Sequence, residues 1–306
     1  GKIERFKLDA IAKEIEDYKK THSLIDFTDM LDLCVQKQLS PKLDVMFVDE
    51  AQDLSSLQYR MAIIASSQAK EVYIAGDDDQ AIFEWAGADV KKFLSLKGEK
   101  IILPQSFRIP KSVHILANDV VSRIKNRYPK KWSPRKEKGA VFYIGYDENI
   151  NFNEHKGTWL CMSRSKYLLN RIKKIVRQQG HAYTLNGKSS LDSSETKAIT
   201  SWERVRKGIN ISMHEAKNLI KFFNFNVRLK PGDSYGVTDL GMPEDFRKKD
   251  WMEVLRNLPP DEREYLRSCL RNGQQFSDKP KITISTIHQS KGGEADNVVL
   301  ITDMGK

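Results

Sequence analysis

The sequence predicts an α/β fold in which a mainly parallel sheet is interrupted by a helical insert. Short apolar runs typical of buried strands alternate with patterns typical of amphipathic helices, and this alternation favours a parallel sheet. From about residue 190 to 278 the helical patterns continue without strand patterns, and a strand pattern returns at 282–286. We therefore expect an α/β architecture that is interrupted and then resumed.

The expected elements follow one another along the chain. Residues 1–20 predict an amphipathic helix with Ile3, Ile11, Ile15 and Tyr18 on one side. Apolar residues at helical spacing predict further helices over 57–64, 113–124 and 168–176. The expected strands are VMFV (45–48), VYIA (72–75), KIIL (100–103), VFYI (141–144), TWLCM (158–162), ITIST (282–286) and VVLI (298–301).

Within the expected insert, two helix starts carry a capping-box pattern. Ser212 is followed by Glu215, and Asp261 by Glu264. Two prolines at 259–260 separate the helices. This stretch is therefore predicted to be mainly helical.

Composition restricts the class of protein. A length of 306 residues suggests about two domains. No apolar run approaches the roughly 20 residues of a membrane helix, and the start is no signal peptide. The three cysteines are far apart without metal-clip spacing, which favours a reduced, intracellular compartment and disfavours a structural zinc site. We expect no membrane partner.

The chain is basic, with a net charge of +10. Residues 122–139, SRIKNRYPKKWSPRKEKG, contain eight Lys or Arg and one Glu, with Tyr128 and Trp132 between them. Such a segment could bind nucleic acid, because cations attract phosphates and aromatic rings stack on bases. It could equally be a basic surface connector, and the sequence does not decide between the two.

The first candidate site is LDVMFVDEAQD at 43–53. A buried strand ends there in Asp49 and Glu50, with Asp53 shortly after. Ligands of α/β folds bind at the carboxyl ends of parallel strands. One carboxylate can hold magnesium while its neighbour polarises an attacking water. A strand that merely ends in a polar turn is the plainer alternative.

A second strand leads into GDDDQAIFEWAGAD at 76–89. Asp77 and Asp79 are expected to hold the turn. Gln80 can donate to a phosphate oxygen and accept from a water, and so could sense a γ-phosphate. Trp85, if exposed, offers a flat face to a nucleic-acid base. Taken alone, Phe83 and Trp85 could instead be core residues.

Two further segments carry candidate residues. In LPQSFRIP (103–110), Phe107 and Arg108 precede a helix, and the arginine could reach a phosphate across a cleft. In TISTIHQSKGGEAD (283–296), paired glycines permit close backbone approach. A surface arginine and a structural histidine, His288, are the plainer alternatives.

The order and spacing of these segments resemble superfamily 1 DNA helicases of the UvrD/Rep type. DFTDML (26–31) resembles the segment just ahead of that family's motif II. DEAQD resembles motif II, GDDDQAIFEWAGAD motif III, LPQSFRIP motif IV and TISTIHQSKGGEAD motif V. The resemblance covers nearly the whole chain and is weakest in the insert.

The resemblance implies a role for each matching residue. It implies ATP and Mg²⁺ as cofactors, with single-stranded DNA and single-strand/double-strand junctions as partners. The implied catalytic residues are Asp49, Glu50, Gln80 and Arg108, of which Asp49 and Glu50 are also the metal-site residues. The implied nucleotide-binding residues are Phe107, Arg108, Gln80, Gly292 and Glu294. The implied DNA-binding residues are Phe83, Trp85, Thr286 and His288.

The family fold implies two RecA-like parallel-sheet lobes, both incomplete here, with the mainly helical insert in the second lobe. The first lobe would comprise residues 1–109, the second 110–190 and 279–306, and the insert 191–278. The expected activity is ATP-dependent translocation on DNA and its unwinding in a bacterial or phage-infected cell. A non-catalytic nucleic-acid-binding module and the motor part of a helicase–nuclease are the alternatives.

The sequence departs from the family pattern in four ways. It has no G-x-x-x-x-G-K-[ST] phosphate loop, and the family's last arginine motif does not follow VVLITD. We expect a fragment that hydrolyses ATP poorly. Phe83 and Phe107 stand where the family often has Tyr, so stacking is kept and a hydroxyl is lost. Glu84 and Ala86 replace the basic neighbours of the tryptophan.

Overall fold

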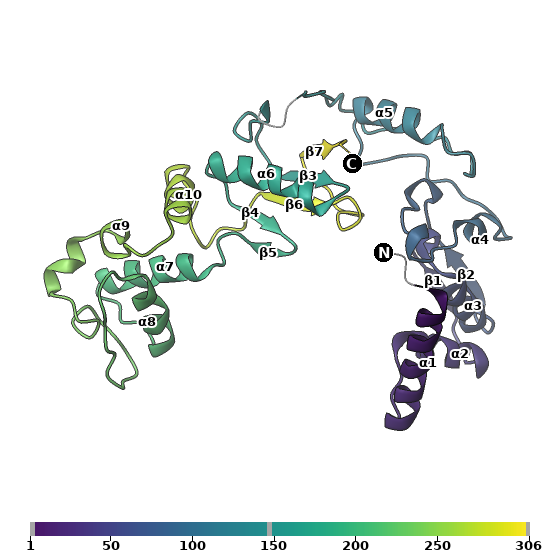
Figure 1. Cartoon of the computed structure of the whole chain (residues 1–306). Coiled ribbons are helices and arrows are strands. Elements are labelled where there is room, and N and C mark those ends of the chain that lie inside the picture. Colours follow the sequence, from purple (N-terminus) through teal and green to yellow (C-terminus); the bar gives the residue numbers. More distant parts are fainter. Residues whose placement is uncertain (1–3, 146–148, 304–306) are drawn as a thin grey trace. The chain divides into compact units, whose positions relative to one another are not determined.

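The computed structural model describes residues 4–145 and 149–303 (Figure 1). The chain divides into two compact units, Gly1–Val141 (unit 1) and Phe142–Lys306 (unit 2). Each unit contains parallel strands together with helices, which confirms the mixed α/β class.

Unit 1 contains two strands and five α-helices among its described residues. Its elements are α1 (Arg5–His22), α2 (Phe27–Gln36), β1 (Val45–Val48), α3 (Ser56–Ala65), β2 (Glu71–Ile74), α4 (Val90–Leu94) and α5 (Lys111–Val121). Three 3-10 turns, Ala51–Asp53, Asp78–Gln80 and Glu84–Ala86, follow the strands. The strands β1 and β2 pair in parallel, with Val48 opposite Ile74.

Local sequence signals explain the helices that lead into these strands. Asp26 caps α2 and forms a capping box with Asp29. Ser55 caps α3 and forms a capping box with Gln58. Tyr59 of α3 is buried and donates a hydrogen bond to the Ala51 carbonyl at 2.5 Å, so α3 is tied to the chain that leaves β1.

Unit 2 contains a five-stranded sheet in the order β5-β4-β6-β3-β7. Its elements are β3 (Trp159–Ser163), α6 (Lys166–Gln178), β4 (Tyr183–Leu185), β5 (Lys188–Ser189), α7 (Ser194–Arg206), α8 (Met213–Leu219), α9 (Trp251–Val254), α10 (Pro260–Arg271), β6 (Ile282–Thr286) and β7 (Asn297–Ile301). Strand β3 lies between β6 and β7 and is parallel to both. Only β5 is antiparallel to its neighbour among the described strands.

A single hydrophobic core fills unit 2. Helix α6 buries its apolar side, and Trp202 of α7 and Leu266 of α10 are completely buried. Core residues come from the sheet and from residues 191–278 alike. That stretch contains helices α7 to α10 and the isolated bridge Ile211–Tyr235, as its helical patterns predicted.

The structure corrects three sequence predictions. KIIL (100–103) and VFYI (141–144) form no strand. An apolar run becomes a strand only where a neighbour accepts its backbone hydrogen bonds, and no described strand lies beside either run. Asp261 does not cap α10; the helix begins at Pro260 with Pro259 before it, and Asp261 lies in its first turn. The Ser212–Glu215 capping box is confirmed.

The division between the units differs from the expected lobe boundary at residue 109. Residues 110–141 group with unit 1. The reason is visible in their backbone hydrogen bonds, because residues 133–138 pair with residues 104–112. The extent of the two lobes stays a prediction.

Two general features of the described residues bear on function. None of their helices is both long and apolar enough to cross a membrane. All three cysteines are free thiols. Burial raises the pKa of Cys161 to about 12 and that of Cys269 to about 11, so neither is a reactive thiolate near neutral pH.

Candidate functional site

The carboxyl ends of β1 and β2 lie side by side in unit 1. Asp49 and Glu50 follow β1, and the loop that begins at Gly76 follows β2. The Ala51 amide donates to the Ala75 carbonyl at 3.0 Å, which joins the two loops directly after the strands. The expectation that both polar segments reach one edge of a parallel sheet is confirmed.

Glu50 has an unusual backbone conformation. Its φ of 52° and ψ of 36° lie in the left-handed region, which costs a non-glycine residue about 1–3 kcal/mol. Its amide donates to Asp49 Oδ1 at 2.8 Å, and both side chains are exposed. The sharp turn thus presents two adjacent carboxylates at the end of the strand.

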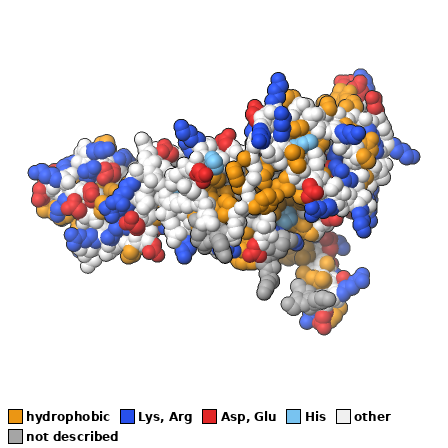
Figure 2. Space-filling view, turned by 90° about the horizontal axis from the view of Figure 1, so that it is seen from above, with side chains coloured by type: hydrophobic (Ala, Val, Ile, Leu, Met, Phe, Trp, Pro, Cys, Tyr) orange, Lys and Arg blue, Asp and Glu red, His pale blue; other side chains and the backbone are white. Residues whose placement is uncertain are grey.

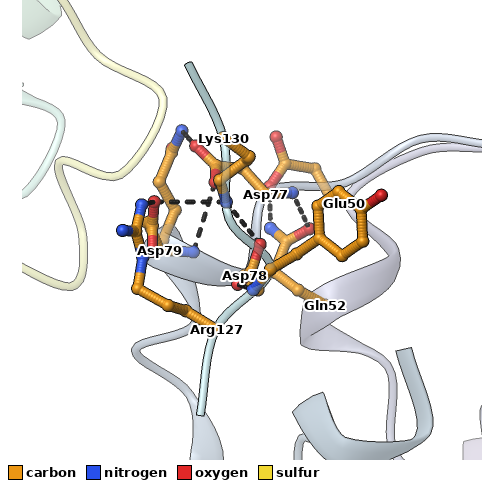
Figure 3. Close-up of polar contacts among 9 residues, drawn as sticks. Glu50, Gln52, Asp77, Asp78, Asp79, Arg127 and Lys130 are labelled. Carbon is orange, nitrogen blue, oxygen red and sulfur yellow. Dashed lines mark hydrogen bonds and ion pairs between the residues drawn. The ribbon is translucent and has the colours of Figure 1, made fainter. Parts of the chain in front are cut away.

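Gln52 connects the two loops through its side-chain amide. This side chain is 1% exposed. Its Nε2 donates to Glu50 Oε2 at 2.7 Å, and its Oε1 accepts from the Asp77 amide at 2.9 Å (Figure 3). A Cβ at Gly76 would lie 2.6 Å from Gln52 Oε1, so this close passage requires glycine. Gln80 continues the path, because its Nε2 donates to Asp77 Oδ2 at 2.6 Å.

The three consecutive carboxylates 77–79 face two cations of the basic segment (Figure 3). Asp77 holds its own turn by accepting from the Asp79 amide at 3.2 Å, as expected. Asp79 also receives two hydrogen bonds from Arg127, at 2.8 and 2.7 Å. Burial opposes ionisation of Asp79, yet hydrogen bonds from Arg127 and Lys130 outweigh it and lower the pKa of this carboxyl.

The aromatic candidates differ in exposure. Trp85 is 74% exposed and Phe107 is 83% exposed. Phe83 is half-buried, with its ring centroid 6.5 Å from that of Trp85. Arg108 is exposed in the loop before α5. Trp85 therefore presents the open face that stacking requires, while its role on DNA stays a prediction.

The candidates in unit 2 lie at the end of β6 and in the loop between β6 and β7. Gly292 has a φ of 77°, and Glu294 is exposed. His288 is half-buried. Thr286 is 7% exposed, and its hydroxyl bonds within its own turn to Gln289. Because β3, β6 and β7 are parallel, this loop begins at the carboxyl edge of the sheet, where β6 ends, and crosses to the start of β7.

Four residues of the site were not assigned roles by sequence reasoning: Gln52, Gly76, Arg127 and Lys130. Gln52 lies inside DEAQD, where the carboxylates carry the metal-binding signal. The two cations lie in a segment rich in Lys and Arg, where nothing in the sequence distinguishes them from the others. The available signal was charge balance, since three adjacent carboxylates require nearby cations when they are buried.

The carboxylates after β1 suit a magnesium ion that binds together with phosphates. Among the described residues no group of three or more His, Cys, Asp or Glu could enclose a metal. Mg²⁺ usually takes one or two carboxylates, with waters and substrate phosphates completing its shell. Asp49 and Glu50 match that requirement, because both are exposed carboxylates directly after β1.

Comparison with known proteins defines the class. Residues 2–100, which include the strands β1 and β2 and the loops that follow them, match the UvrD/REP helicase N-terminal domain. This part of the chain is therefore similar to the N-terminal domain of UvrD/Rep-type helicases.

Three relatives of the chain are named as DNA helicases. The chain is 28% identical over 189 residues to the ATP-dependent DNA helicase Rep of Buchnera aphidicola. The aligned region covers 52% of this chain and 28% of that protein. The chain is 28% identical over 190 residues to a probable DNA helicase II homolog of Rickettsia conorii, covering 56% of this chain and 27% of the relative. Over 94 residues it is 34% identical to the ATP-dependent DNA helicase PcrA of Staphylococcus aureus, covering 29% of this chain and 13% of the relative.

Proposed function

We propose that the chain is the core of an ATP-dependent, single-stranded DNA translocase that unwinds DNA. One observation carries this proposal: the hydrogen-bonded path from Glu50 through Gln52 and Asp77 to Gln80. It joins the carboxylates expected at the nucleotide to the loop that presents Trp85. Such a path is what coupling between a nucleotide site and a DNA site requires. The names of the relatives, ATP-dependent DNA helicases, support it.

The nucleotide half of the proposal assigns roles in both units. Asp49 and Glu50 would hold Mg²⁺, which offsets the negative charge of the phosphates. Glu50 would accept the proton of the attacking water, and Gln80 would bind the γ-phosphate. Phe107 would stack on adenine while Arg108 reaches the γ-phosphate. In unit 2, Gly292 would let the backbone approach the nucleotide closely, and Glu294 would bind the ribose.

The DNA half depends on exposed aromatic rings and on the β6–β7 loop. Trp85 and Phe83 would stack on successive bases of the single strand. Thr286 and His288 would contact its backbone; the burial of Thr286 means that its backbone, or a small opening of its turn, would make that contact. A junction of single- and double-stranded DNA would be the substrate that is unwound.

A non-catalytic nucleic-acid-binding module is the second candidate, and one observation favours it. The 306 residues contain no G-x-x-x-x-G-K-[ST] segment to cradle phosphates. We expect this chain by itself to hydrolyse ATP slowly, even with single-stranded DNA present. An ATPase assay on the chain tests this, and fast DNA-stimulated turnover would contradict it.

Trp85→Ala tests the DNA half. Loss of one stacked base should weaken binding of an oligothymidylate by about 1–3 kcal/mol. Fluorescence anisotropy at two salt concentrations measures it, and the salt dependence should not change because no charge is removed. Phe47→Ala is the matched control, because Phe47 is an equally exposed aromatic residue on β1, away from the loop. Equal affinities of the wild type and Trp85→Ala would refute stacking at this position.

A further inference from the structure

The basic segment makes two sets of contacts inside unit 1. We define the strap as residues 127–138, the part of the segment between Arg127 and Lys138. We propose that the strap is a positioning element that fixes the loop of Gln80 relative to the loop of Arg108. The roles of Gln80 and Arg108 rest on the proposed function, whereas the contacts of the strap do not.

The first end of the strap binds all three carboxylates after β2. Arg127 donates from Nε and Nη2 to the two oxygens of Asp79, a bidentate geometry that fixes direction as well as distance. Lys130 Nζ contacts Asp77 at 2.6 Å and also Asp78. These side chains are largely buried apart from Asp77, with 21% of Arg127 and 16% of Lys130 exposed (Figure 3).

The backbone of the strap adds to this first contact. The Tyr128 amide donates to Asp78 Oδ2 at 2.7 Å. Lys130 and Gln80 bind the two oxygens of the same carboxylate, that of Asp77. The position of Gln80 therefore depends on a carboxylate that the strap also holds.

The second end of the strap pairs with residues on both sides of Arg108. The Ser133 amide donates to the Pro104 carbonyl at 2.7 Å, and the Ser133 carbonyl accepts from the Ser106 amide at 2.8 Å. Past the loop, the Arg135 amide donates to the Ile109 carbonyl at 2.9 Å. These bonds bracket Phe107 and Arg108 and hold both ends of their loop.

Further bonds extend this pairing to the start of α5. The amides of Lys111 and Ser112 donate to the carbonyls of Glu137 and Lys138, at 3.1 and 2.9 Å. His114 of α5 packs edge-on against Trp132, with ring centroids 4.2 Å apart. One short strap thus connects the two loops on which the proposed nucleotide contacts lie.

The same contacts explain the role of Arg127 and Lys130, two of the eight Lys and Arg side chains in residues 122–139. Because Arg127 and Lys130 are paired and mostly buried, they are not presented to a phosphate backbone. A phosphate-binding cation contributes to the salt dependence of DNA affinity, whereas an internally paired one does not.

Hydrogen exchange of the chain tests the inference with Arg127→Gln. We expect amide exchange to become faster by roughly tenfold or more in both 76–80 and 104–112, as loss of charge-assisted hydrogen bonds would give. The control is Lys131→Gln, which removes an exposed cation from the same strap and should change neither segment. Acceleration confined to 76–80 would overturn the inference, because the strap would not link the two loops.

A double-mutant cycle tests whether the ion pair of Arg127 with Asp79 transmits the effect to residues 104–112. Asp79→Asn and Arg127→Gln should each accelerate exchange in 104–112, and the double variant should add little to either single variant. Fully additive effects would overturn the role of this pair. If Arg127→Gln unfolds β1 as well, Arg127→Lys replaces it; this variant keeps the charge, loses the bidentate geometry and should give a smaller acceleration in the same two segments.

Binding of single-stranded DNA gives an independent readout. Arg127→Gln and Lys130→Gln should leave the slope of log affinity against log salt unchanged. A decrease of about one for each residue would overturn the inference, because it would show direct phosphate contacts. Failure of the proposed function looks different: Trp85→Ala would bind DNA like the wild type while the exchange coupling between the two loops persisted.

Discussion

The two units bury apolar residues to very different extents. In unit 2, sheet and helices share one core that includes the fully buried Trp202 and Leu266. Among the described residues of unit 1, the only buried apolar side chains are Val35, Ala51, Tyr59 and Val90. Phe47 of β1 is 76% exposed, although it lies in a strand. Apolar side chains also reach the surface of the chain that Figure 2 shows.

Different forces order the two units. Burial of apolar area stabilises unit 2, as in most globular domains. In unit 1 a hydrogen-bonded and ion-paired network orders the loops after β1 and β2, and little apolar area is buried beneath it. Unit 1 is therefore expected to respond to charge and hydrogen-bond changes, and unit 2 to changes of core volume.

Trp202→Ala in unit 2 should lower the free energy of unfolding more than any other substitution considered below. This side chain is fully buried, and its Nε1 donates to the Lys249 carbonyl at 3.2 Å. Truncation should lower the free energy of unfolding of unit 2 by about 3–5 kcal/mol. Urea unfolding followed by circular dichroism measures it.

Phe47→Ala is the matched truncation in unit 1. Its ring stacks on that of Tyr73, with centroids 5.2 Å apart. The expected cost is below about 1 kcal/mol. A cost as large as that of Trp202→Ala would contradict the difference between the units, because it would mean that the face of β1 and β2 is covered in solution.

Gln52→Leu should destabilise the loops of unit 1 by an amount between the costs of Phe47→Ala and Trp202→Ala. The substitution keeps the volume but leaves the partly buried Asp77 amide without its acceptor, which costs about 1–3 kcal/mol. Amide exchange in 49–53 and 76–80 should become faster, and the unfolding of unit 2 should not change. Gln68→Leu is the control, because Gln68 is an exposed glutamine of the same unit with a single bond to the Ser40 carbonyl. Equal exchange in Gln52→Leu and Gln68→Leu would argue against the path through Gln52.

Sequence patterns predicted the elements that depend on local order. VMFV, TWLCM, ITIST and VVLI all became strands, within a residue at their ends, because each run has a neighbouring strand to pair with. KIIL is also a mainly apolar run, but no described strand lies beside it. The short hairpin β4–β5 was missed, because Lys188–Ser189 carries no apolar pattern.

The candidate site shows the same limit. That Asp49, Glu50 and Gln80 share one edge of a sheet followed from parallel strands, and the structure confirms it. That Gln52 would turn inward to join two loops, or that Arg127 would bind a carboxylate 48 residues away, could not follow from spacing, because both depend on how the loops fold back. The lowered pKa of Asp79 is likewise a property of that folding.

The smallest expected difference between the units is in their stability at low pH, where unit 1 should lose order before unit 2. Arg127 and Lys130 lower the pKa of Asp79 below its ordinary value of 3.8, so the folded loop favours the ionised carboxylate. Its contribution to stability is therefore fully present above about pH 4 and is lost as the pH falls through the lowered pKa. Asp77 and Asp78 face the same two cations, and both cations stay charged in this range because their pKa values are raised.

Protection of the Tyr128 amide measures this response, because the amide donates to Asp78 inside the network. After correction for intrinsic exchange, protection should fall as the pH is lowered below about 4, while amides of β3 in unit 2 keep theirs. In Asp79→Asn the protection should already be lower at pH 6 and should depend less on pH. If the Tyr128 and β3 amides lost protection together, acid would be acting on the whole chain, and the ion pairs would not be what distinguishes unit 1.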